Sequence, residues 1–86
     1  MNTTVRLKIK KEVDTPTARK ILKLKGSLIA NSFTDIIHFD DEGDEFYIHY
    51  FTVNSLKKAE AVAYAGLFIE KNALTETVII LQDSLR

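Results

Sequence analysis

Residues 4–11 read Thr-Val-Arg-Leu-Lys-Ile-Lys-Lys, a stretch in which apolar and cationic side chains alternate. Val5, Leu7 and Ile9 share one side of this alternation, and the cations share the other. A period of two residues is typical of a β-strand with one buried face. The stretch therefore predicts a strand that turns its three apolar residues toward a core.

The residues that follow predict a helix. In Asp14-Thr15-Pro16, either Asp14 or Thr15 can cap the helix, and Pro16 lies near the first helical position, where its missing N–H costs nothing. Apolar residues then recur at helical spacing, which predicts an amphipathic helix to about residue 31. These apolar residues are Ala18, Ile21, Leu22, Leu28 and Ile29.

Residues 33–39 and 45–53 are rich in β-branched and aromatic side chains, and they flank the acidic segment 40–44. This pattern predicts a β-hairpin. One possible turn is of type I, with Asp40 first and Gly43 fourth. The other is an even loop centred on positions 42 and 43, which agrees better with the apolar pattern and is favoured.

The even loop also predicts which side chains share a face. It places Ile37 and Phe39 beside one set of apolar residues on the second strand, and it turns the alternate set away. The first set is Phe46, Ile48 and Tyr50; the alternate set is Tyr47, His49 and Phe51.

The remaining elements complete the fold. Asn54 or Ser55 starts a second helix that ends near Asn72, and residues 75–82 form the last strand. The element order is thus β-α-β-β-α-β. Short connections and right-handed crossovers favour an α+β ferredoxin-like sandwich, with four antiparallel strands in the order 4-1-3-2 and two helices on one face. We expect a single domain over residues 1–86.

Charges are sorted along the chain although the net charge of the 86 residues is zero. Residues 1–25 contain eight basic and two acidic residues, a net charge of +6, whereas residues 26–54 contain six acidic and no basic residues. Residues 55–86 are balanced, with four of each. Such blocks predict a polarised surface that selects its partners by charge.

Composition also limits the class of protein. The chain has no cysteine, so it has neither a disulfide framework nor a thiolate metal site. The N-terminus lacks the apolar segment of a signal peptide, and the longest uncharged apolar run, residues 61–69, is too short to span a bilayer. We therefore expect a cytoplasmic protein with no membrane association.

The acidic hairpin tip is the first candidate site. We expect it to lie beside the end of the first strand and the start of the first helix. Neutralisation by Lys10, Lys11, Arg19 and Lys20 is the favoured interpretation. The alternative is a knob that docks into a basic partner or imitates nucleic-acid phosphates. The tip consists of Asp40, Asp41, Glu42, Asp44 and Glu45.

The open face of the sheet is the second candidate site. Cations beside aromatic rings are suited to binding RNA or single-stranded DNA, and RNA-recognition modules use this topology. Residues 44–51, however, lack the leading basic residue and the glycines of their signature. A second subunit covering the face is the alternative. The predicted residues are Arg6, Lys8, Lys10, Tyr47, His49 and Phe51.

The sequence contains no motif for catalysis or for a cofactor. His38 and His49 lie on neighbouring strands, but they lack further ligands for a metal. Phosphate-binding loops, nucleophile elbows and zinc helices are also missing from the sequence. We therefore expect no enzyme, no cofactor and no metal.

The expected function is that of a small binding or regulatory protein acting on a protein or nucleoprotein target. A homodimer through the sheet face is one possible assembly. Proteins of this size class include phage- or plasmid-encoded inhibitors of host machinery, an expectation that no motif carries. The alternative function is RNA or single-stranded DNA binding through the open sheet face.

Overall fold

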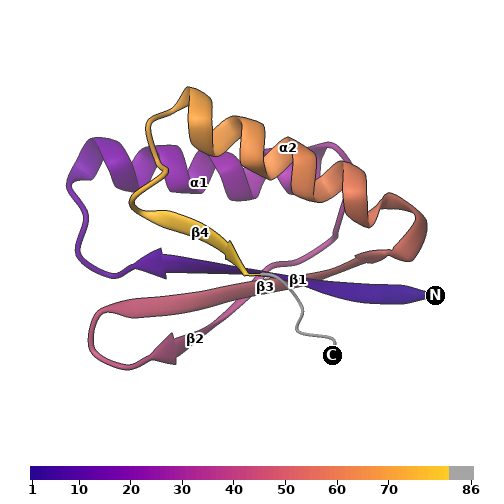
Figure 1. Ribbon diagram of the computed structural model, residues 1–86, viewed down its shortest axis with the longest axis horizontal. Helices are drawn as coiled ribbons and strands as arrows, with labels where there is room; N and C mark the ends of the chain where they lie inside the picture. The colour runs from indigo at the N-terminus through magenta and orange to yellow at the C-terminus, as the bar shows by residue number, and fades with distance from the viewer. Residues whose placement is uncertain (82–86) are drawn as a thin grey trace.

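The computed structural model describes residues 1–81, and its elements follow the predicted order (Figure 1). The four strands form one antiparallel sheet in the order β2-β3-β1-β4, which is the predicted order read from the other edge. Both helices cover the same face of this sheet. The ferredoxin-like α+β fold is therefore confirmed. The elements are β1 (Asn2–Lys10), α1 (Thr15–Ala30), β2 (His38–Glu42), β3 (Phe46–Asn54), the 3-10 turn η1 (Ser55–Lys57), α2 (Lys58–Lys71) and β4 (Val78–Leu81).

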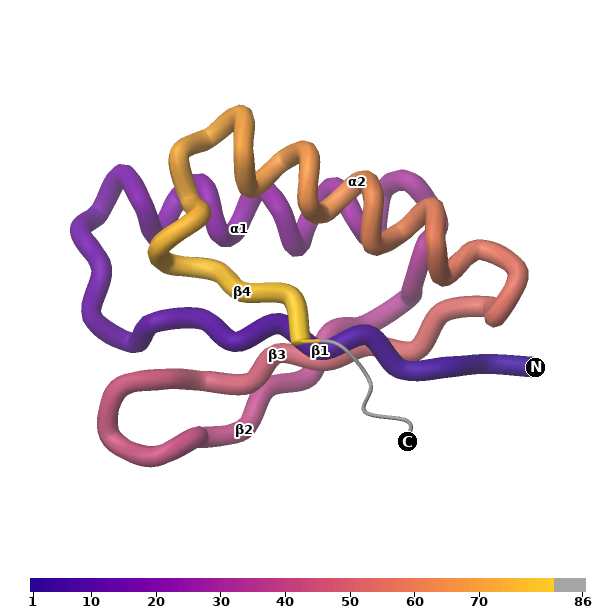
Figure 2. Tube along the Cα trace, in the orientation of Figure 1, coloured from indigo at the N-terminus to yellow at the C-terminus, as the bar shows by residue number. Residues whose placement is uncertain are grey.

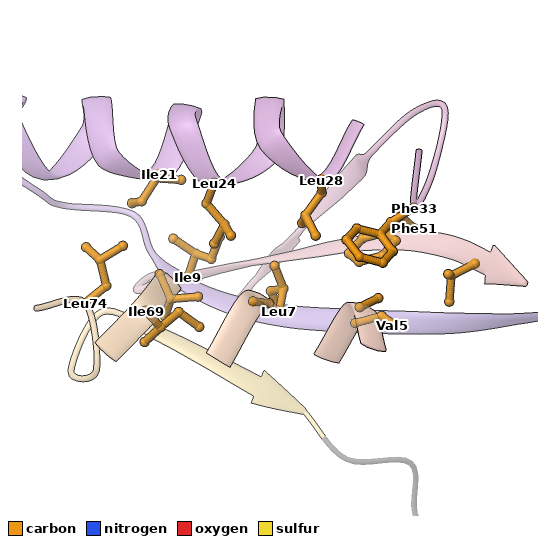
Figure 3. Close-up of a cluster of buried hydrophobic side chains, with 14 residues drawn as sticks. Val5, Leu7, Ile9, Ile21, Leu24, Leu28, Phe33, Phe51, Ile69 and Leu74 are labelled. Carbon is orange, nitrogen blue, oxygen red and sulfur yellow. The ribbon is translucent and has the colours of Figure 1, made fainter. Parts of the chain in front are cut away.

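The core forms between β1 and the helices, as the alternation in the first strand predicts. Side chains of β1 and α1 point toward one another in this layer (Figure 3). Fully burying one such aliphatic side chain contributes about 1.5–3 kcal/mol to folding. The other side of β1 consequently faces away from both helices. The contacting residues include Val5, Leu7 and Ile9 from β1 and Ile21, Leu24 and Leu28 from α1.

The buried stripe of α1 differs from the predicted one. Ile21, Leu24 and Leu28 are buried, whereas Leu22 is 64% exposed and Ile29 is also exposed. The buried residues follow the i, i+3, i+7 spacing of one helix face. Apolar residues occur on both sides of this stripe, so the sequence pattern alone was ambiguous.

Both predicted hairpin turns are wrong. Phe39 pairs with His49 instead of Phe46, and residues 43–45 form a three-residue turn in which Gly43 has a φ of 70°. A positive φ is readily adopted by glycine because it has no Cβ. Residues 33–37, predicted as strand, precede β2, and β2 instead runs through part of the acidic segment.

The last strand, β4, is shorter than the predicted strand over residues 75–82. β4 comprises Val78–Leu81, and Gln82, the last residue of the predicted strand, lies outside the described residues.

At the opposite edge of the sheet, the hairpin turn lies at the same end of the molecule as the connection from β1 to α1 (Figure 2). No helix within residues 1–81 is long and apolar enough to cross a membrane.

Candidate functional site

Lys11 ties the hairpin turn to the end of β1. Its ammonium group lies 3.0 Å from the Asp41 carboxylate and donates a hydrogen bond of 2.9 Å to the Gly43 carbonyl. Its backbone N–H donates to the Glu45 carbonyl at 2.8 Å. The basic and acidic blocks therefore meet at this end of the sheet, as predicted.

The other cations predicted to neutralise the tip lie elsewhere. The Lys20 ammonium donates to the Asn72 carbonyl at 3.1 Å and so joins the start of α1 to the end of α2. Arg19 is exposed on α1, and Lys10 alternates with the buried residues of β1 and faces away from the helices. Of the four cations predicted to neutralise the acidic tip, Lys11 is therefore the one that pairs with a carboxylate of the tip.

The carboxylates of the acidic tip are all exposed, but they do not form one patch. Asp40 and Glu42 share the open face of the sheet with their partners on β3, whereas Asp41 points to the helix side. Asp44 and Glu45 lie in the turn. The predicted knob is therefore divided, and two of its members belong to the open sheet face.

The three predicted cations of the open face are placed as expected. Arg6, Lys8 and Lys10 alternate with the buried residues of β1, so they lie on the side without helices. One of these cations contacts an aromatic ring: the Lys8 Nζ atom lies 4.5 Å from the centroid of the Phe46 ring. A cation over an aromatic face is attracted by the ring quadrupole.

The three predicted rings are on the wrong face. Tyr47, His49 and Phe51 pair with Ile9, Leu7 and Val5 of β1, so they point toward the helices. Phe51 is only 1% exposed, and His49 only 6%. The cause is the hairpin register, since a shift by an odd number of residues moves a strand's side chains to the other face.

The rings and aliphatic chains that occupy the open face are the alternate set. Phe46, Ile48 and Tyr50 lie between the β1 cations and the acidic residues of β2. Ile79 and Leu81 of β4 lie on the far side of the cations. The face therefore consists of four columns, each along one strand, and we call it the striped face. Its columns are Asp40 and Glu42 with His38 on β2; Phe46, Ile48 and Tyr50 on β3; Arg6, Lys8 and Lys10 on β1; and Ile79 and Leu81 on β4.

The central row of the striped face shows this arrangement most simply. Asp40, Ile48, Lys8 and Ile79 follow one another across the four strands. Ile48, between the two charge columns, is half-buried, and Ile79, beyond the cations, is 45% exposed, so apolar surface is accessible on both sides of the β1 cations. Apolar surface rimmed by polar groups is typical of an interaction site.

On the helix side, the displaced rings form a second cluster. The ring of Phe39 stacks on that of His49 at 5.5 Å between centroids and meets Tyr47 edge-on at 5.3 Å. Burial, and to a smaller extent the nearby Lys25 charge, lower the pKa of His49 to about 4. The imidazole is therefore neutral at pH 7.

The two histidines lie on opposite faces. His38 stacks on Tyr50 at 5.3 Å on the striped face, whereas His49 points to the helix side. The described part of the chain contains no group of three histidine or carboxylate side chains arranged to hold a metal ion.

Sequence reasoning placed Phe46, Ile48 and Tyr50 on the wrong face because all residues from 46 to 51 are apolar or aromatic, so both faces of this strand look equally suited to the core. The available signal was Val53. It continues the alternation of Tyr47, His49 and Phe51, and a buried set of four is longer than a set of three.

Comparison with known proteins does not assign the chain to a family. No family model matches it, and no curated protein matches it as a relative.

Proposed function

We propose that this chain is a non-enzymatic binding protein that docks a protein partner on the striped face. The observation that supports this proposal is the sorting of acidic, apolar and basic side chains into separate columns. A protein that acts by covering a surface of its partner regulates that partner without chemistry of its own.

The columns define the partner that fits. Burying Lys8 or Asp40 without a counter-charge would be costly, because a charge removed from water must be paired. A suitable partner therefore presents carboxylates opposite β1, apolar side chains opposite β3 and cations opposite β2. Charge columns of this kind give specificity and fast association more than raw affinity.

A second copy of the chain satisfies these requirements. Consider two sheets packed face to face about a two-fold axis that runs along β3. This axis places the β3 strands of the two protomers against each other, and it places β2 of each protomer over β1 of the other. Asp40 then lies opposite Lys8 of the second copy, and the Ile48 side chains meet at the axis. An axis perpendicular to the strands would instead stack the β1 cations on one another.

The size of the face predicts a weak homodimer. Nine-residue strands such as β1 and β3 are roughly 30 Å long, and neighbouring strands are about 4.8 Å apart. The face is thus at the low end of specific interfaces, which bury about 800 Å² per partner. We expect dissociation in the micromolar range.

RNA or single-stranded DNA binding is the second candidate function. The contact between the Lys8 ammonium and the Phe46 ring favours it, since stacking rings beside cations suit single strands. The acidic column on the same face opposes it, because Asp40 and Glu42 repel phosphates. The protein partner is therefore the preferred candidate.

A charge-swap experiment tests the proposal. Sedimentation velocity over a concentration series measures self-association of the natural chain, of Lys8→Glu and of Asp40→Lys. Each single swap places like charges opposite one another twice per dimer, and we expect at least about tenfold weaker association. Mixing the two variants should restore it, because Glu then faces Lys.

Lys23→Glu is the matched control, since Lys23 is exposed on α1. The proposed dimer is wrong if both swaps associate as the control does. Binding of a single-stranded oligonucleotide that falls steeply with salt, is lost in Lys8→Glu and is strengthened in Asp40→Lys would support the second candidate function instead.

A further inference from the structure

An apolar cleft of about 340 Å³ opens between α1 and the β2–β3 hairpin, on the other side of the sheet from the striped face. We propose that this cleft binds a small amphipathic organic acid, such as an aromatic or medium-chain aliphatic carboxylate. Ligand pockets usually have volumes of about 300–1,000 Å³, so the cleft suits a small ligand. Its apolar and aromatic walls include Val13, Ile21, Leu22, Phe39, Tyr47 and His49.

The cleft lies on the helix side of the sheet, and its walls nevertheless expose apolar surface to solvent. Leu22 and Phe39 both line the cleft, and both are among the most exposed large apolar side chains of the chain. The Phe39 ring is held in place by Tyr47 and His49. A flat or flexible apolar ligand would cover this surface without rearranging the rings.

His49 lines the cleft and carries a buried polar atom that lacks a partner within the described residues. Its side chain is more than nine-tenths buried, and within the described residues its Nδ1 atom has no hydrogen-bond partner. A buried polar atom without a partner is unusual in a folded protein and calls for an explanation. Because this atom is shielded from solvent, the ring contributes an aromatic wall to the cleft rather than a hydrogen-bond donor to the ligand.

Lys25 supplies the charge that selects an acid. Its side chain lines the cleft, and it forms no ion pair within residues 1–81. Lys10 and Lys11 also line the cleft, but the Lys10 side chain belongs to the striped face and the Lys11 ammonium already contacts Asp41. The Lys25 ammonium is therefore the group available to a ligand carboxylate, while the apolar part of the ligand packs on Leu22 and the rings.

Two probes test this inference on the full chain. Anilinonaphthalene sulfonate, a fluorescent aromatic anion, reports binding, and decanoate below its micelle-forming concentration competes for the cleft. We expect Lys25→Gln to weaken both by about tenfold or more, because hydrogen bonds to charged groups are among the stronger ones. Lys23→Gln, on the exposed side of α1, should bind as the natural chain does.

Proton NMR of the ring resonances locates the bound acid independently of affinity. Decanoate should shift the resonances of His49 and Tyr47 and leave those of His38 and Tyr50 on the striped face unchanged. Ile79→Glu, which alters the striped face only, should retain this pattern. Leu22→Glu should lose binding by placing a carboxylate at the cleft.

Two results would overturn the inference. One is an equal affinity of Lys25→Gln and Lys23→Gln for decanoate, and the other is a shift pattern centred on His38 and Tyr50. Because neither variant at positions 22 and 25 touches the striped face, a failure here is distinct from a failure of the proposed protein docking.

Discussion

His49 lies directly opposite Leu7 across β3 and β1, so an ionisable ring occupies the helix-facing layer of the sheet. Leu7 is fully buried at this position. Protonation of His49 would place a charge beside the apolar core and near Lys25, which explains why its pKa is lowered. The folded state is therefore more stable with His49 neutral than with His49 protonated.

The first prediction concerns the pH dependence of stability. The pKa of His49 is about 4 in the folded chain, against about 6.5 in an unfolded one. The unfolded state therefore binds the proton first, so the stability contributed by neutral His49 is complete above pH 6.5 and is lost as pH falls toward 4. Urea unfolding across this window should show a loss of up to about 3 kcal/mol.

Two variants isolate the contribution of this ring. His49→Phe removes the titrating group, so its stability should vary far less between pH 6.5 and 4. His38→Gln changes the exposed histidine and should keep the dependence of the natural chain. A dependence that survives in His49→Phe would assign the effect to other groups.

The second prediction separates the two sides of α1. Leu24→Ala should destabilise the chain by about 2–5 kcal/mol, because Leu24 is fully buried and its truncation leaves a cavity. Leu22→Ala should cost about 0.5 kcal/mol or less, since most of this side chain is exposed. The free energy of unfolding in urea measures both. Equal costs would contradict this prediction, and a larger cost for Leu22→Ala would show that α1 packs with the face that the sequence pattern also allowed.

The third prediction concerns the start of α1. The Asp14 carboxylate accepts a hydrogen bond of 2.8 Å from the Thr17 N–H. Hydrogen bonding from the Thr17 side chain and from this backbone N–H lowers the pKa of Asp14. Asp14→Ala should cost about 1 kcal/mol of stability, as loss of an N-cap usually does. Asp14→Asn, which can still accept the bond, should retain most of it. An Asn variant as unstable as the Ala variant would point to charge rather than capping.

Local signals explain what the sequence predicted correctly. The alternation through Val5, Leu7 and Ile9 and the Asp14 cap each depend on neighbouring residues, and both appear in the structure as predicted. The strand order followed from short connections and the handedness of crossovers. These rules act at the level of whole elements and do not require a correct register.

The register of the hairpin depends on information that is not local. Tyr47, His49 and Phe51 could face the core as well as Phe46, Ile48 and Tyr50, and the choice is made by pairing with β1, far away in sequence. The striped face could therefore be predicted in its β1 cations but not in its β3 rings. The cleft beside His49 could not be predicted either, because the predicted register turned His49 away from the helices.

The last prediction tests the register directly. The chain has no natural cysteine, so a disulfide between two introduced residues reports on their separation alone. Asp40 and Ile48 are cross-strand partners, whose Cβ atoms lie about 4.5–5.5 Å apart in such pairs, close to the Cβ distance within a disulfide. Asp40→Cys combined with Ile48→Cys should oxidise readily at low protein concentration, measured by mass spectrometry. Ile37→Cys combined with Ile48→Cys joins the partners of the even loop and should stay reduced, because these positions lie on opposite faces. The reverse outcome would restore the even loop and return Tyr47 and His49 to the open face.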